Sequence, residues 1–134
     1  MRVRFPPRLR NTVIMKIDYE YKKPDVVQEI ETKYPEMCKE YLRIVAEGYE
    51  TFCYKQSNYG PSNITVGTSL QSEDDVRLSL TGIWFRINDK IQRLKQLIVL
   101  GKQDNVGESV DDTFQDLSVY GIIALIVKRK KWAK

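Results

Sequence analysis

Carboxylates and basic side chains that lie off the apolar positions of three expected helices are the residues of this chain best suited to chemistry. The acids are Glu47, Glu50, Asp89, Asp112 and Asp116, and the bases are Lys55, Arg86, Lys90 and Arg93. Carboxylate oxygens are ligands that Mg²⁺ or Mn²⁺ prefers, whereas Lys and Arg bind phosphate oxygens. If the helices bring these side chains together, the pattern predicts a site for a divalent cation and a nucleotide.

Spacing alone leaves a plainer interpretation open for most of these acids. Asp89 and Arg93 are four residues apart and could form a surface ion pair. Asp112 could be only a helix-capping residue. Glu47 and Glu50 could face solvent. Asp116 differs because it precedes an apolar half-helix by one turn, where an acid needs a cation or an arginine as its partner.

The loop at residues 58–63, with the sequence NYGPSN, is a second candidate for ligand binding. Gly60 can adopt positive φ and Pro61 restricts the next turn. Asn58 and Asn63 could offer amides to a ligand, and Tyr59 could stack on a base. The alternative is a loop that only ends a helix, with Tyr59 packed in the core, and core packing is the interpretation we favour for Tyr59.

The residue types also exclude several classes of site. The chain of 134 residues has no His, which excludes serine-type triads, zinc fingers and imidazole acid–base chemistry. Cys38 and Cys53 fall on one expected helix, separated by about 22 Å at ~1.5 Å per residue. A disulfide needs Cα atoms within about 7 Å, so we expect both thiols to be reduced.

Charge is distributed unevenly along the chain. The formal net charge is +4, but residues 24–127 hold 10 Lys plus Arg against 16 Asp plus Glu, a net of −6. The excess of positive charge lies at the two ends. An acidic centre is not typical of a nucleic-acid-binding domain, so a nucleic-acid partner is not expected. The basic run at 128–134 could contact phosphates or favour a helix C-terminus.

Periodicity predicts an all-α fold, a bundle of about four helices. The helices are expected at 25–33, 36–56, 73–100 and 109–131. Ser72 with Asp75, and Ser109 with Asp112, resemble capping boxes at two helix starts. Residues 24–134 would form a single helical domain, preceded by a short extended arm at 1–23. Residues 1–14 lack any regular pattern, and we interpret them as an upstream start, with the native protein beginning at Met15.

The last two helices carry the clearest apolar patterns. The third is expected to bury a stripe that runs from Val76 to Ile98, and the fourth to turn Phe114 inward. The second half of the fourth helix, GIIALIV, is apolar on every side, so it must be covered on all sides. We therefore expect a homo-oligomer through this helix. Its apolar run is too short to span a bilayer, and no leader-like stretch is seen, so a cytoplasmic location is expected.

Three linked motifs resemble a known family. They are Lys55-x-x-Asn58-Tyr59-Gly60-Pro61-Ser62-Asn63-Ile64, then Gly82 with Arg86-Ile87-x-Asp89-Lys90-Ile91-x-Arg93-Leu94, then Glu108-Ser109-x-x-Asp112-Thr113-x-x-Asp116-Leu117-x-x-Tyr120. Their order and spacing, over roughly residues 37–127, resemble the nucleotide-modification-associated domain family of phages and bacteria. This family is all-helical and is similar to the MazG-like all-α nucleoside triphosphate pyrophosphatases, which hold Mg²⁺ on helical carboxylates.

The resemblance implies a role for each candidate residue. It places Asp89, Asp112 and Asp116 as metal-binding acids and Lys55, Arg86, Lys90 and Arg93 as phosphate or network partners. Glu47 or Glu50 would act as a further ligand or as the base. Two departures stand out: Asn58 occupies a position where the family often has Asp, and Glu47-x-x-Glu50 with Glu108-x-x-Asp111 matches the pyrophosphatase signature imperfectly.

Two functions follow as expectations. The first is a Mg²⁺-dependent (or Mn²⁺-dependent) nucleoside triphosphate pyrophosphohydrolase. The second is a phage-encoded anti-defence protein, acting in the host cytoplasm, that sequesters a nucleotide or cyclic nucleotide without turnover. An assembly protein with no ligand is a third interpretation.

Overall fold

The computed structural model describes Ile17 and residues 22–134. The extended arm expected at residues 1–23 and the upstream segment at 1–14 lie largely or wholly outside the described residues. Those residues are all-α and contain no strand. They form two compact units, one up to Tyr54 and one over Lys55–Lys134. The expected single helical domain at 24–134 therefore contains two units, and the boundary falls within a helix.

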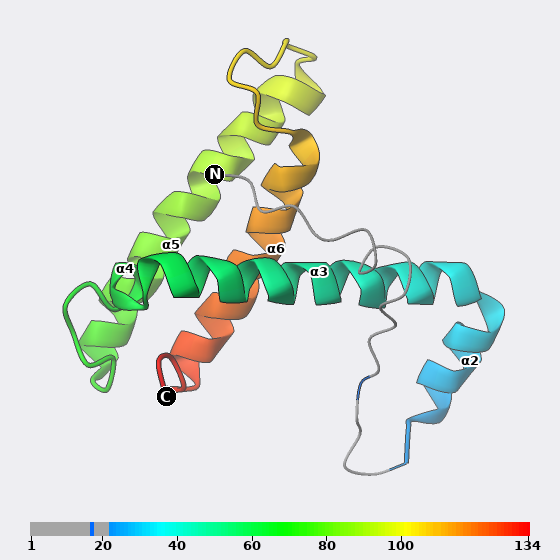
Figure 1. Cartoon of the computed structure of the whole chain (residues 1–134), viewed down its shortest axis with the longest axis horizontal. Coiled ribbons are helices and arrows are strands. Elements are labelled where there is room, and N and C mark those ends of the chain that lie inside the picture. Colours follow the sequence, from blue (N-terminus) through cyan, green and yellow to red (C-terminus); the bar gives the residue numbers. More distant parts are fainter. Residues whose placement is uncertain (1–16, 18–21) are drawn as a thin grey trace. The chain divides into compact units, whose positions relative to one another are not determined.

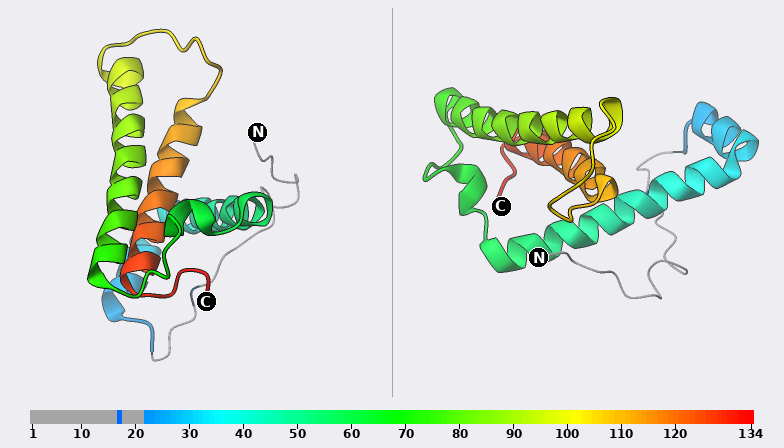
Figure 2. Two further views of the ribbon diagram at one scale, coloured as in Figure 1. Left: turned by 90° about the vertical axis from the view of Figure 1, so that its left-hand side faces the viewer. Right: turned by 90° about the horizontal axis from the view of Figure 1, so that it is seen from above.

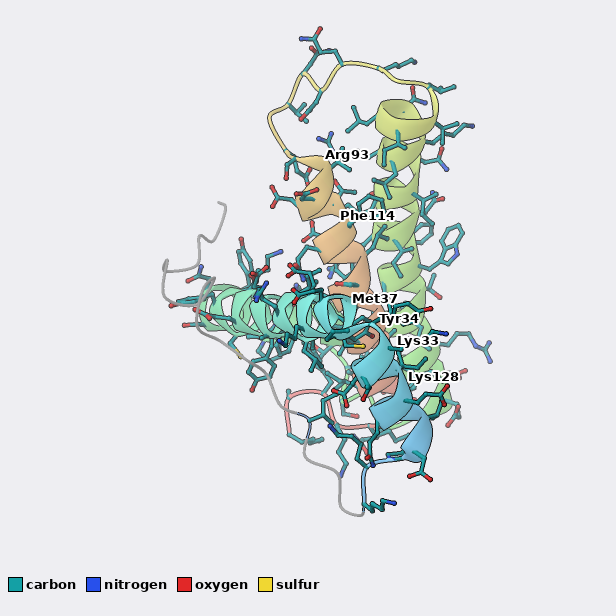
Figure 3. All side chains as sticks on the ribbon, turned by 90° about the vertical axis from the view of Figure 1, so that its right-hand side faces the viewer. Lys33, Tyr34, Met37, Arg93, Phe114 and Lys128 are labelled. Atoms are coloured by element: carbon teal, nitrogen blue, oxygen red, sulfur yellow. The ribbon has the colours of Figure 1, made fainter. Side chains whose placement is uncertain are left out.

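The N-terminal unit holds helix α2 (Asp25–Lys33) and most of helix α3 (Pro35–Tyr59) (Figure 1). Tyr34 ends α2 at φ −130° because the residue before a proline is pushed out of the helical region. The Lys33 ammonium lies 5.3 Å from the centroid of the Tyr34 ring at this junction (Figure 3). Helix α2 has the predicted bounds, and α3 is slightly longer than predicted.

The C-terminal unit contains the last turn of α3, the short helix α4 (Ser62–Thr65), α5 (Glu73–Leu94), the π-helical turn η1 (Lys95–Val99) and α6 (Val110–Lys128). Helices α5 and α6 lie side by side and run in opposite directions (Figures 1 and 2). The loop at 100–109 joins them, so the end of α5 and the start of α6 are at the same end of the pair.

Both predicted caps are present. The Ser72 hydroxyl accepts a hydrogen bond from the Asp75 N–H, and the Ser109 hydroxyl accepts one from the Asp112 N–H. Each serine satisfies one of the free N–H groups in a helical first turn. Ser109 therefore fixes where α6 begins.

Helix α5 ends earlier than predicted. It stops at Leu94, and five residues of π-helix follow, with the Leu100 N–H donating to the Lys95 carbonyl. A π-turn holds more residues than an α-turn and therefore rotates later side chains off the helical stripe. Ile98 was predicted to be buried and is about half exposed.

The buried apolar residues of the C-terminal unit come from α4, the first half of α5, the second half of α6 and the segments that flank them. The apolar ones are Ile64, Leu70, Val76, Ile83, Ile123, Val127 and Trp132. The Ser79 hydroxyl, also buried, donates to the Ile64 carbonyl at 2.7 Å and so holds α4 on α5. The prediction for Phe114 is wrong: it is half exposed, whereas its neighbour Thr113 is fully buried.

The C-terminal tail turns back instead of continuing α6 to residue 131. Lys130 takes positive φ, 55°, and the Lys130 and Lys131 N–H groups bond to the Val127 and Ile126 carbonyls. This is the Schellman arrangement that ends many helices. Trp132 is then buried, and its indole N–H donates to the Pro61 carbonyl at 3.1 Å. The tail therefore fastens the NYGPSN loop to the end of α6.

No helix within the described part of the chain combines the length and the apolar character needed to cross a bilayer.

Candidate functional site

The site lies where the end of α5 meets the start of α6. Lys90 and Arg93 come from the last turns of α5, Glu108 and Asp104 from the loop that follows, and Asp116 from the second turn of α6. Because α5 and α6 are antiparallel and joined by this loop, groups at the end of one helix lie beside groups at the start of the other.

Asp116 holds two ammonium groups. Its Oδ1 lies 3.2 Å from the Lys55 Nζ, and its Oδ2 lies 3.0 Å from the Lys90 Nζ. Lys55 sits near the end of α3, within the C-terminal unit. The prediction that Asp116 needs a cationic partner is confirmed, and it has two.

Lys90 and Arg93 extend the network to the loop. The Lys90 Nζ also lies 2.9 Å from the Glu108 Oε1. The Arg93 Nη2 lies 3.1 Å from the Asp104 Oδ1 and also donates to the Glu108 carbonyl, while the Arg93 Nε donates to the Thr113 hydroxyl at 3.3 Å. Arg93 thus lies beside the first turns of α6 (Figure 3).

We call these six side chains the charged cluster, which consists of Lys55, Lys90, Arg93, Asp104, Glu108 and Asp116. Three cations face three carboxylates, so the cluster is balanced in charge. Lys90, Arg93 and Asp116 are about 20% exposed, at 21%, 18% and 20%. Ion pairs at this depth are screened less than surface pairs but remain reachable from solvent.

The protonation of Lys90 follows from its surroundings. Burial lowers its pKa, but hydrogen bonds and charge interactions with Glu108 and Asp116 outweigh burial and raise the pKa above its ordinary value of 10.5. The pKa of Asp104 is held below its ordinary value of 3.8, mainly by the Val106 N–H, against slight desolvation and with help from Arg93. Lys90 therefore carries its positive charge and Asp104 its negative charge at neutral pH.

The three cations of the cluster are of the kind that bind phosphate. Lysine ammonium and arginine guanidinium groups bind phosphate oxygens through charge-assisted hydrogen bonds. In the cluster each of them already has a carboxylate partner, so an incoming phosphate would compete with Asp116 and Glu108 for the same cations. It would add negative charge to a balanced cluster, and the displaced carboxylates would then need water or another cation as their partner.

Four of the predicted residues come together here, whereas Arg86 and Asp89 lie outside the cluster. Lys55, Lys90, Arg93 and Asp116 belong to the cluster. The Arg86 Nη2 donates instead to the Asn63 carbonyl at 3.0 Å, which ties α5 to α4. Asp89 is exposed on α5 and does not pair with Arg93, so the surface ion pair considered for them is absent.

The NYGPSN loop is exposed at its chemically useful positions. Asn58, Tyr59 and Asn63 are all exposed, and Tyr59 keeps 64% of its surface. The expectation that Tyr59 packs in the core is wrong. It lies one turn after Lys55 on α3, which places both residues on the same face of that helix.

Glu47 and Glu50, the predicted catalytic acids, lie on α3 within the N-terminal unit. Every member of the charged cluster lies in the C-terminal unit. Their catalytic role stays a prediction.

The acidic side chains could hold a metal ion only together with a bound molecule that supplies further oxygen ligands. Within residues 22–134, no three acidic or thiol side chains gather closely enough to hold a metal ion. Mg²⁺, however, is usually held by one or two carboxylates together with the phosphates of a substrate. Asp112 and Asp116 are one turn apart on α6, and both oxygens of Asp116 are already paired with lysines.

Sequence reasoning gave no site role to three contributors, Asp104, Glu108 and Thr113. Glu108 and Thr113 entered only within the motifs of the family resemblance, and Asp104 was not considered. The available signal was the Asp104-x-Val106 spacing, in which the Val106 N–H donates to the Asp104 carboxylate at 3.0 Å and makes a local turn.

Comparison with known proteins gives one finding. The family described as nucleotide modification associated domain 1 matches residues 55–127. No curated protein and no solved structure matches the chain. The matched range begins at the residue where the C-terminal unit begins, and it includes all six members of the charged cluster.

Proposed function

The chain belongs to the nucleotide modification associated domain 1 family, and from this premise we propose that it binds a nucleotide through its phosphates at the charged cluster. The observation that carries the proposal is the meeting of Lys55, Lys90 and Arg93 at one place, partly buried and held by exchangeable carboxylates.

Phosphate oxygens would replace the oxygens of Asp116 and Glu108 as partners of the two lysines. Such bonds to charged groups contribute about 1.5–3 kcal/mol each. Tyr59, exposed one turn from Lys55, is the proposed stacking partner of the base. Asn58 and Asn63 would contact the sugar or the base edges.

One candidate activity is Mg²⁺-dependent pyrophosphohydrolysis of a nucleoside triphosphate. The placement of Asp112 and Asp116 one turn apart on α6 favours it, because these two carboxylates could hold a cation that arrives with the nucleotide. The bound cation would supply polarisation of the phosphate and a more acidic water. Lys90 and Arg93 would bind the charge that develops on the phosphate oxygens.

The other candidate activity is sequestration of a nucleotide or cyclic nucleotide, as an anti-defence protein encoded by a phage would require. The pairing of both Asp116 oxygens with lysines favours it. A carboxylate occupied in this way is a weak cation ligand, so the cluster would bind an anion without turning it over.

Mass spectrometry separates the two activities. The protein is incubated with Mg²⁺ and a panel of deoxynucleoside triphosphates and cyclic nucleotides, then denatured. Monophosphate and pyrophosphate, lost in the Asp112→Asn/Asp116→Asn variant, support the hydrolase. Intact nucleotide released only on denaturation supports sequestration. Absence of both products and bound nucleotide would overturn nucleotide binding itself.

Homo-oligomerisation through the apolar half of α6 forms part of the proposal. Ile122 and Leu125 on this helix are each about half exposed, beside the buried Ile123 and Val127. An Ile122→Asp variant should then lose copies from the assembly in light scattering, and an unchanged mass would contradict the contact. A diffusible nucleotide ligand agrees with a cytoplasmic site of action.

A further inference from the structure

The backbone of the NYGPSN loop is held by side chains from two distant parts of the C-terminal unit. The Trp132 indole N–H donates to the Pro61 carbonyl at 3.1 Å, and the Arg86 Nη2 donates to the Asn63 carbonyl at 3.0 Å. The tail that carries Trp132 ends beside this segment in both views of Figure 2. Two carbonyls of one short loop are therefore fixed by donors that lie 71 and 23 positions away in the sequence.

The loop presents side chains to solvent while its backbone is fixed. Asn58, Tyr59 and Asn63 are exposed. Gly60 turns the chain with a φ of 70°, and its N–H donates to the Gln56 carbonyl at 2.8 Å. A loop that only ends a helix needs a residue with positive φ and a backbone bond of this kind, but it needs no donor from a distant element. The two additional donors fit a loop whose side chains keep one orientation for a ligand.

The loop and the charged cluster are neighbours along two helices. Arg86 precedes Lys90 by four residues, so both side chains lie on one face of α5 with Cβ atoms about 6 Å apart. Lys90 and Lys55 share the Asp116 carboxylate. Lys55 in turn lies one turn before Tyr59 on α3. A molecule with its phosphates at the cluster would therefore have the loop beside it.

We propose that Trp132 and Arg86 are positioning residues, which hold the NYGPSN loop in the orientation that meets the base and sugar of a nucleotide. This inference rests on the proposed function, because it places the phosphates of the same nucleotide at the charged cluster. Neither positioning residue touches the nucleotide. Their bonds order the loop backbone in the free protein, so that nucleotide binding does not have to order it.

Two variants remove these bonds and keep most of the packing. Trp132→Phe keeps a ring in the buried position but has no indole N–H. Arg86→Met keeps a long side chain without the guanidinium. The matched controls are Trp84→Phe and Arg77→Met, which make the same changes at exposed positions of α5.

Calorimetry with two kinds of probe separates positioning from phosphate binding. The nucleotide probes are the four deoxynucleoside triphosphates, cyclic AMP and cyclic GMP, and the phosphate probe is inorganic triphosphate. We expect Trp132→Phe and Arg86→Met to weaken nucleotide affinity by about tenfold, since ordering one backbone residue costs about that factor. Affinity for inorganic triphosphate should be unchanged, and both controls should match wild type. Lys90→Met should instead weaken the affinity for both kinds of probe.

Hydrogen exchange measures the order of the loop with no ligand present. The N–H groups of Gly60, Ile64 and Thr65 are hydrogen-bonded within this segment. We expect their exchange to become about tenfold faster in Trp132→Phe and in Arg86→Met, because local opening becomes easier. Amides in the first turns of α6 should exchange at the wild-type rate, which distinguishes local opening from a loss of global stability.

The outcomes distinguish this inference from the proposed function. Unchanged nucleotide affinity in both variants, or unchanged exchange of the loop amides, overturns the positioning role and leaves nucleotide binding intact. An equal loss of nucleotide and inorganic triphosphate affinity in Arg86→Met overturns it for Arg86, because that side chain would then contact phosphate. If no probe binds wild-type protein, the proposed function fails and the positioning role fails with it.

Discussion

The two ends of the α5–α6 pair are built from different interactions. At one end, the last turns of α5 and the first turns of α6 meet through ion pairs among Lys90, Arg93 and Asp116. At the other end, buried apolar side chains and the hydrogen bonds of Trp132 and Ser79 join α4, α5, α6 and the tail, and exposed Lys130 adds a bond to the Gln71 carbonyl. The same two helices thus carry a polar end and an apolar end.

The two ends should therefore contribute differently to the free energy of unfolding and to ligand binding. Burial of apolar surface contributes about 25 cal/mol per Å² and is not easily replaced by solvent. Partly exposed ion pairs contribute little net stability because water and other anions compete for their members. We therefore assign most of the stability to the apolar end, whereas the proposed nucleotide site is at the charged end.

The largest effect is expected for Trp132→Ala at the apolar end. Loss of this buried side chain and its bond to the Pro61 carbonyl should lower the free energy of unfolding by about 3–5 kcal/mol. Urea denaturation followed by circular dichroism measures the change. The exposed aromatic Tyr59→Ala serves as the control, with a change below about 0.5 kcal/mol. A loss near zero for Trp132→Ala would contradict the assignment of stability to this end.

The next effect is expected for Ser79→Ala. The Ile64 carbonyl would lose its buried donor, which costs about 1–3 kcal/mol. Ser118→Ala is the matched control, because its hydroxyl makes a similar bond at an exposed position on α6. Equal losses for the two variants would show that burial of the bond does not matter.

At the charged end, Lys90→Met should lower the affinity for nucleotide while leaving the free energy of unfolding nearly unchanged. We expect unfolding to change by about 1 kcal/mol or less, since Asp116 keeps Lys55 and solvent can reach both acids. Nucleotide affinity, measured by calorimetry, should fall by about tenfold or more. Lys102→Met, in the exposed loop, should leave affinity unchanged. Retained affinity in Lys90→Met would move the binding site away from the cluster.

The smallest effect is a dependence of stability on high pH. The pKa of Lys90 is raised in the folded chain, so its stabilising contribution is complete below about 10.5 and is lost as pH rises through the folded value. Thermal midpoints of wild type and Lys90→Met should therefore converge above that pH. Midpoints that differ by a constant amount up to pH 12 would show that the ammonium is not the stabilising group.

Much of the local structure could be predicted from the sequence. The bounds of α2, the caps at Ser72 and Ser109, and the paired state of Asp116 follow from residue type and spacing, because capping and burial of charge are local requirements. The end of α5 could not be predicted, since a stripe of apolar residues does not distinguish α-helix from the π-turn that follows Leu94.

The features that could not be predicted depend on contacts between residues far apart in the sequence. Lys55 meets Asp116 across 61 positions, and Trp132 meets Pro61 across 71. In the sequence, the tail was only a basic run and Tyr59 was expected to be buried.

The sequence by itself determined that this chain is helical, where most helices begin, and which residue types could bind phosphate. Periodicity carries that information because it fixes the faces and ends of single helices. The tertiary structure alone decided which of those residues meet, that Arg86 serves α4 rather than the cluster, and that Asp104 joins it. The rotation and axial offset between α5 and α6 set these contacts, and both depend on packing over the whole unit.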